Sequence, residues 1–172
     1  MGEYLIVDGY NVINAWKEFA ALREENLEHA RDLLVAGIAE YSAFKGYRGI
    51  VVFDAQEVSG PGEVTKIHGI EVVFTDEGET ADSWIERRAY ELGRLRRKVF
   101  VVTSDYAEQI NILGAGAYRI SSREFREEYR KTRQEIAARL KLPARAMNRN
   151  ELGGRLQGHV LEHFEQLRRR KS

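Results

Sequence analysis

Short apolar runs alternate along the chain with longer segments in which apolar residues recur every three or four positions. Four runs have the length and the Val, Ile and Phe content of buried strands, and they span residues 4–7, 49–54, 70–74 and 99–103; residues 117–120 form a fifth, weaker one. The clearest helical segment covers residues 27–44. Strands that alternate with helices favour right-handed crossovers and helices on both faces of the sheet. The pattern therefore predicts a three-layer α/β/α fold around a mostly parallel sheet of about five strands.

Helical periodicity also predicts four further helices, over residues 81–97, 107–113, 122–140 and 151–170. Thr80 is the predicted N-cap of the first of them. Ser121 or Ser122 is the predicted N-cap of the third, which is strongly charged. Together with the segment 27–44, these helices are enough to cover both faces of the sheet.

Two segments interrupt the periodic pattern. Residues 55–69 contain a Ser-Gly-Pro-Gly turn cluster and predict an irregular crossover or loop. Pro143 is predicted to end the charged helix, because a proline removes a backbone hydrogen bond from a helix interior. We therefore expect a principal domain over residues 1–141, with a basic linker and helix over residues 142–172 that packs on it or extends from it.

Aspartates follow four of the predicted strands: Asp8, Asp54, Asp76 and Asp105. The carboxyl ends of parallel strands border the ligand crevice, so these acids would repel one another unless a cation lay between them. With the strand order 3-2-1-4-5, Asp8 and Asp105 would be neighbours where the order reverses. A metal-dependent site is the first hypothesis for this edge, although an aspartate after a strand is also a common turn former, as we expect for Asp76.

Asp82 joins this set from a helix. It lies in the first turn of the predicted helix 81–97, where the helix dipole favours a carboxylate. Oxygen ligands in a chain without cysteine suit Mg²⁺ or Mn²⁺ better than zinc. Such ions, held by Asp8, Asp82 and Asp105 with Asp54 as a candidate fourth ligand, would support hydrolysis of a phosphodiester.

Supporting roles are open for several polar residues near this edge. Asn11 could bind a substrate phosphate or cap the first helix, and Ser104 could assist Asp105 or cap the helix after it. Arg87 and Arg88 could hold phosphates, or they could be part of a solvated helix face. Trp16 could stack on bases or belong to the core.

The charge of the chain is zero overall but unevenly distributed. Residues 123–172 contain 14 Lys and Arg against 7 Asp and Glu, and residues 1–122 contain 13 against 20. This asymmetry favours a polyanion as partner, although a solvated helix is also rich in arginine. The apolar runs are far shorter than the ~20 residues that span a bilayer. We expect a cytoplasmic protein without membrane association, acting as a monomer.

Two other enzyme classes are weakly indicated. Residues 159–163 read His-Val-Leu-Glu-His, a zinc peptidase motif, but only nine residues follow and a third ligand is missing. A phosphatase that uses Asp8 as nucleophile would have a second aspartate two residues later, and that residue is Tyr10. Both classes are disfavoured.

Three short motifs occur along the chain: Asp-Gly-Tyr-Asn-Val-Ile from Asp8 onward, Thr-Ala-Asp ending at Asp82, and Thr-Ser-Asp ending at Asp105. In these motifs and their order, the chain resembles the YacP-like NYN domain family of bacterial nucleases. The resemblance implies a fold similar to PIN-domain nucleases and an acidic Mg²⁺ or Mn²⁺ site. By motif, Asp8, Asp82 and Asp105 would be the metal-holding acids, with Asn11 and Ser104 in support.

The resemblance also implies a function. Characterised members are ribosome-associated endoribonucleases that cut messenger RNA during translation, inside the ribosomal A site. We therefore expect a metal-dependent endoribonuclease that acts on single-stranded RNA, with the ribosome as partner and a role in mRNA decay. The alternative is a nonenzymatic RNA-binding or ribosome-binding module with a vestigial acidic site.

Overall fold

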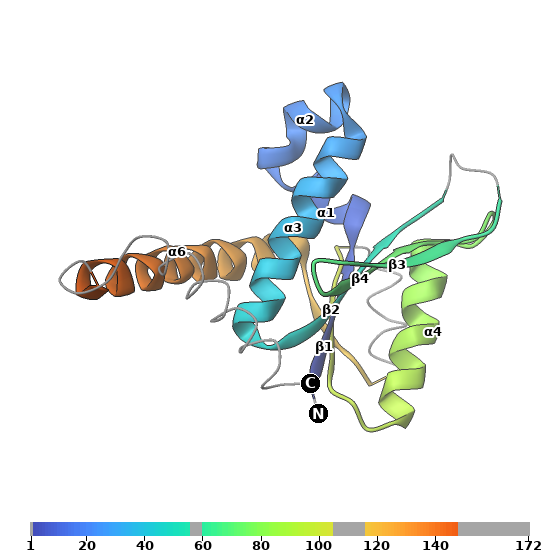
Figure 1. Cartoon of the computed structure of the whole chain (residues 1–172). Helices are drawn as coiled ribbons and strands as arrows, with labels where there is room; N and C mark the ends of the chain where they lie inside the picture. Colours follow the sequence, from blue (N-terminus) through green and yellow to red (C-terminus); the bar gives the residue numbers. More distant parts are fainter. Residues whose placement is uncertain (1, 56–59, 105–115, 148–172) are drawn as a thin grey trace.

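A computed structural model describes residues 2–55, 60–104 and 116–147 of the chain, with the backbone alone over 141–147. Strands and helices alternate as the apolar pattern predicts (Figure 1). The strands are β1 (Glu3–Asp8), β2 (Tyr47–Phe53), β3 (Glu63–Ile67), β4 (Ile70–Phe74), β5 (Val99–Val102) and β6 (Tyr118–Ile120). The helices are α1 (Gly9–Ala15), the 3₁₀ turn η1 (Lys17–Phe19), α2 (Ala20–Glu25), α3 (Leu27–Lys45), α4 (Ala81–Arg94) and α6 (Ser122–Met147).

The strands form one sheet in the order β3-β4-β2-β1-β5-β6. The five predicted strands are parallel and adopt the predicted order, which reverses between β1 and β5. β3 corrects the expected irregular crossover over residues 55–69, because it pairs antiparallel with β4 across a turn at His68 and Gly69. Both turn residues have positive φ, as two-residue hairpin turns require. Every residue of β3 is exposed, so this edge strand leaves no apolar run in the sequence.

Two apolar clusters lie on opposite faces of the sheet. Successive strand residues point to opposite faces, and in β1 Leu5 and Val7 belong to the cluster under α1, α3 and α6. Ile6 belongs to the cluster under α4. Figure 1 shows α4 on one side of the sheet and α3 and α6 on the other. The sheet is therefore covered on both faces, which explains why its central strands are apolar without alternation.

α6 is docked on the first helices mainly through Trp16, which is only 2% exposed. The Trp16 ring packs on Phe125 and Tyr129 of α6, with centroid distances of 5.8 and 5.0 Å. Arg126 donates hydrogen bonds to both oxygens of Glu18, and this contact lowers the pKa of the Glu18 carboxyl. Trp16 is thus a core residue, the second of its two sequence interpretations.

The predicted helix break at Pro143 is wrong. α6 continues from Ser122 to Met147, through the boundary expected between residues 141 and 142. A proline deletes a single helical hydrogen bond, and a long helix can accommodate that loss. Within the described residues, none of the helices combines the length and the apolar character needed to cross a membrane.

Replacing Gly9 with alanine should destabilise the fold by about 1–3 kcal/mol, the usual cost of overpacking a core. A Cβ at Gly9 would lie 2.3 Å from Cε1 of Phe53, whose ring is fully buried and has no room to move. Urea denaturation would measure the loss, with the exposed Ala15→Ser on the same helix as the control. An unchanged midpoint for Gly9→Ala would contradict the close packing of α1 on β2.

Candidate active site at the carboxyl edge of the sheet

Side chains from the carboxyl ends of three neighbouring strands face the same helix. Ile6 packs under α4, so Asp8, two residues later in β1, points to that face as well. The same alternation brings Asp54, just after β2, and Thr103, just after β5, to the α4 side. β1 lies between β2 and β5 in the sheet. Asp8, Asp54 and Thr103 therefore lie on the same side of the sheet edge, next to the point where the strand order reverses.

The first turn of α4 lies at this edge because Asp54 holds it there. An Asp54 carboxylate oxygen accepts a hydrogen bond of 3.2 Å from the backbone N–H of Ala81. Thr80 caps the helix as predicted, since its hydroxyl accepts from the N–H of Ser83 at 3.1 Å. Asp54 thus satisfies a second orphan N–H at the helix start. It links β2 to α4 and positions the residue that follows Ala81, which is Asp82.

Asp82 differs from Asp8 and Asp54 in having no structural contact among the described residues. Its side chain is half-buried, and within the described residues its carboxylate makes no hydrogen bond or ion pair. A carboxylate in the first turn of a helix is stabilised by the helix dipole. Among the described residues, the Asp82 oxygens are therefore available to bind a ligand.

Asp8 is only 8% exposed and is the N-cap of α1. Its carboxylate accepts from the N–H of Asn11 at 3.4 Å. Asp105, the third predicted ligand, lies outside the described residues. Among the residues that are described, no three acids or histidines come close enough to form a metal site by themselves.

Asn11 connects three elements of the site. Its side-chain oxygen accepts from the N–H of Ser104 at 3.0 Å and from the hydroxyl of Ser122 at 2.5 Å. Because a backbone N–H can only donate, the carbonyl oxygen of the Asn11 amide must face Ser104, and the NH₂ group points elsewhere. Asp8 is the helix cap, so the capping interpretation of Asn11 is wrong. Asn11 instead ties α1 to the end of β5 and the start of α6.

Ser122 is the residue of this network that the sequence did not reveal. It is fully buried, and its N–H donates to the Ser104 hydroxyl at 3.1 Å. Its carbonyl accepts from the indole N–H of Trp16 at 2.8 Å. The cap of α6 is Ser121, whose hydroxyl accepts from the N–H of Glu124, so only one of the two candidate serines was needed for that role. The one hint of this role in the sequence was a second serine next to the serine that caps the helix.

The other candidates named from sequence have structural partners. Arg87 makes two hydrogen bonds to Glu79, at 2.9 and 3.4 Å, and Arg88 pairs with Glu91 at 3.3 Å. Asp76 accepts from the N–H of Gly62 and is a turn residue, as expected. The His-Val-Leu-Glu-His motif at residues 159–163 lies outside the described residues.

Comparisons with known proteins agree with the fold and with the motifs. A model of the YacP-like NYN domain family matches residues 5–169. The uncharacterized protein YacP of Bacillus subtilis strain 168 is 41% identical over 169 residues, with 97% of each chain covered. The crystal structure of Rae1 (YacP) from Bacillus subtilis has a TM-score of 0.74 at 40% identity, covering 97% of this chain and 95% of that one. A mutant of the same protein gives a TM-score of 0.75 with the same identity and coverage.

Proposed function

Because the chain belongs to the YacP-like NYN domain family, we propose that it is a metal-dependent endoribonuclease that cleaves single-stranded RNA. Family membership points to an RNase-like nuclease role. The substrate would be messenger RNA on the translating ribosome, cut in the A site as a step of mRNA decay. The protein would act in the cytoplasm as a monomer, without a membrane partner.

The observation that carries this proposal is the convergence of acids on one side of the sheet edge. Asp8 and Asp54 project from neighbouring strand ends toward α4, whose first turn carries Asp82. Asp105 follows Ser104, which is tied to Asn11 of the same edge. Carboxylates that face the same side of a sheet edge, one of them with no structural partner among the described residues, are typical of a site that binds a cation.

The donor set fits Mg²⁺ or Mn²⁺. Asp8 and Asp82, with Asp105, would supply hard oxygen ligands, and the chain contains no cysteine that would favour a softer metal. When bound, such an ion polarises a phosphoryl oxygen and lowers the pKa of a water molecule. Asp54 already holds the Ala81 N–H, so its role would be to position Asp82 and, as a candidate fourth ligand, to add negative charge.

The neutral residues of the site would orient the substrate. The Asn11 NH₂ group is available to donate to a phosphate oxygen, because the amide oxygen is occupied by Ser104 and Ser122. The Ser104 hydroxyl accepts from the Ser122 N–H and retains its own proton for donation. Both groups are held by backbone contacts, so they would meet the phosphate without reorganisation.

Cleavage of a reporter messenger RNA in a reconstituted translation system should depend on translation of that message. The products, mapped by primer extension, should appear with the wild-type protein and largely vanish when initiation on the same message is blocked. The matched control is the same RNA without ribosomes. Equal cleavage of free and translated RNA would remove the ribosome from the proposal, whereas no cleavage under any condition would favour the nonenzymatic module.

A further inference from the structure

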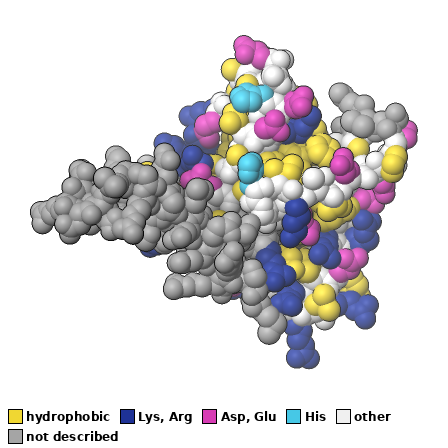
Figure 2. Space-filling view, viewed as in Figure 1, with side chains coloured by type: hydrophobic (Ala, Val, Ile, Leu, Met, Phe, Trp, Pro, Cys, Tyr) yellow, Lys and Arg dark blue, Asp and Glu magenta, His cyan; other side chains and the backbone are white. Residues whose placement is uncertain are grey.

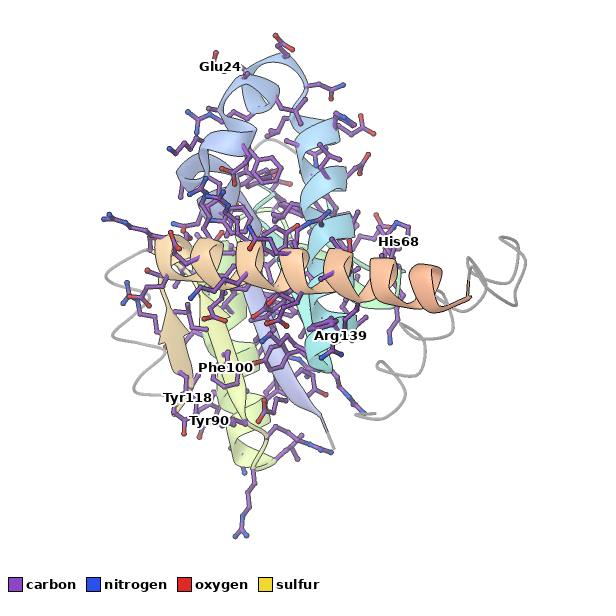
Figure 3. All side chains as sticks on the ribbon, turned by 90° about the vertical axis from the view of Figure 1, so that its left-hand side faces the viewer. Glu24, His68, Tyr90, Phe100, Tyr118 and Arg139 are labelled. Carbon is purple, nitrogen blue, oxygen red and sulfur yellow. The ribbon has the colours of Figure 1, made fainter. Side chains whose placement is uncertain are left out.

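The outward face of α4 carries cations and an exposed aromatic ring along one stripe. Ala81, Ile85, Ala89 and Leu92 form the buried face of the helix. On the opposite side, residues at spacings of three and four form what we call the outer stripe: Arg87, Tyr90 and Arg94. Figure 2 shows Lys and Arg side chains gathered over the part of the molecule where α4 ends, and Figure 3 labels Tyr90.

Tyr90 is a large ring without a partner in the part of the chain that the structure describes. It is 56% exposed, and within the described residues it makes no ring contact, cation–π contact or hydrogen bond. Tyr118 is equally exposed, at 55%, but its ring packs on Phe100 at 5.4 Å and lies 5.5 Å from the Lys98 ammonium. An exposed aromatic face with nothing against it is more informative than an exposed aliphatic residue, because every unpaired base can stack on it.

The charge along α4 changes sign from its first turn to its end. The start of the helix carries Glu79 and Asp82, and four cations are found within residues 94–98. Among these four, only Lys98 has an acid partner in the described part of the chain, Glu3 at 3.6 Å. Arg87 is already neutralised by Glu79, so Arg94 is the cation of the outer stripe that can bind an anion, and Arg96 and Arg97 follow just past the helix end.

The end of the helix retains an arginine where glycine would be less strained. Arg97 N–H donates to the Leu92 carbonyl and Arg96 N–H to the Gly93 carbonyl, both at 2.9 Å, which is the Schellman pattern. Arg96 is the residue in the left-handed conformation, with φ of 56°. Glycine is the usual residue at this position because it has no Cβ. The arginine is therefore not explained by the backbone.

We propose that the outer stripe of α4 binds single-stranded RNA and leads it to Asp82. Arg94 and the two arginines just past the helix end, Arg96 and Arg97, bind backbone phosphates, and Tyr90 stacks on a base. An unpaired strand is the occupant because the bases of a duplex are already stacked on one another. With a rise of ~1.5 Å per residue, Tyr90 lies about 12 Å and Arg94 about 18 Å along the helix from Asp82. The proposal rests on RNA being the substrate, as proposed above.

Fluorescence anisotropy with an unstructured RNA of about twelve nucleotides tests whether the outer stripe binds RNA. EDTA is present so that the RNA stays intact, and a gel verifies this. Tyr90→Ala should weaken binding about tenfold, whereas Tyr90→Phe, which keeps the ring, should bind like the wild type. Arg94→Gln should lower the affinity and reduce the slope of log affinity against log salt by about 0.7, the value for one phosphate contact on a single strand.

Two further variants separate binding from folding. Arg96→Gly should melt at the same or a higher temperature than the wild type and still bind RNA more weakly, because it relieves the left-handed Cβ and deletes a cation. Lys66→Gln removes the same charge from an exposed position on β3 and should have no effect. Wild-type affinity and salt dependence for both Tyr90→Ala and Arg94→Gln would refute RNA binding by the outer stripe.

RNA binding by the outer stripe and RNA cleavage can fail independently, and the experiments distinguish the two failures. Tighter binding of a duplex of the same length, unaffected by Tyr90→Ala, would overturn the single-strand assignment. If binding depends on Tyr90 and Arg94 but the protein cleaves no RNA with Mg²⁺ or Mn²⁺, the outer stripe binds RNA and the endonuclease proposal is refuted. Cleavage by a protein whose RNA affinity does not depend on Tyr90 or Arg94 would support the endonuclease and refute RNA binding by the outer stripe.

Discussion

Asp82→Asn should reduce RNA cleavage at least about a hundredfold, because loss of one charged group that stabilises a transition state typically costs 10²–10³ in rate. The variant should fold normally, since within the described residues the Asp82 carboxylate makes no hydrogen bond or ion pair. The lost interaction with the helix dipole is worth only about 0.3–1 kcal/mol. Asp8→Asn should show the same loss of cleavage, and asparagine is an equally good N-cap for α1.

Glu86→Gln is the matched control for Asp82→Asn. Glu86 is exposed one turn further along α4, so the variant loses the same charge from the same helix without touching the site. A second readout is Mn²⁺ binding, followed by electron paramagnetic resonance on protein without RNA. Asp82→Asn should bind Mn²⁺ much more weakly, and Glu86→Gln should not. Cleavage and Mn²⁺ binding at wild-type levels in Asp82→Asn would refute the metal assignment.

The order of the central strands was predictable because few physical rules determine it. Apolar runs buried on both faces indicate parallel strands, and right-handed crossovers leave few possible orders. The same rules brought Asp8 to the α4 side of the sheet with Asp54. β3 could not be found in this way, because its side chains are all exposed and its strand is made by backbone pairing alone.

The contacts that hold the candidate site together were less accessible to sequence. Asn11 and Ser122 are 111 residues apart, and neither the spacing nor the composition indicates that they meet. For Asp54 the difficulty is that the sequence allows two roles. An aspartate after a strand is compatible with a ligand and with a cap, and only the 3.2 Å contact with Ala81 identifies it as the residue that positions α4.

Local rules also failed where packing outweighed them. Pro143 satisfies the usual criterion for a helix end, yet α6 continues to Met147. The first turns of α6 are fixed by Trp16 and by the pair of Arg126 with Glu18, so the helix is anchored well before the proline. A proline inside a helix costs about 3 kcal/mol, through a lost hydrogen bond and a clash of its ring with the preceding turn, yet this penalty does not end α6 at Pro143.

Trp16→Ala should destabilise the protein by about 3–5 kcal/mol, the range for removing a buried tryptophan. The indole fills the space between α1 and α6, where Phe19, Phe125 and Tyr129 surround it. Its N–H also satisfies the buried carbonyl of Ser122. Urea denaturation would measure the change, with Leu33→Ala, a 47% exposed residue of α3, as the control that should cost well under 1 kcal/mol.

Trp16→Phe separates the two contributions of Trp16, because it keeps much of the apolar contact and deletes the N–H. The Ser122 carbonyl would then be buried without its donor, which costs about 1–3 kcal/mol. Since Ser122 also donates to Asn11, cleavage should fall more than the stability loss alone explains when both are measured well below the unfolding midpoint. If Trp16→Phe were as stable and active as the wild type, the hydrogen bond from the indole would not be what fixes Ser122. The position of Ser122, and with it the contact to Asn11, would then depend on the hydrogen bond from the Ser122 N–H to the Ser104 hydroxyl.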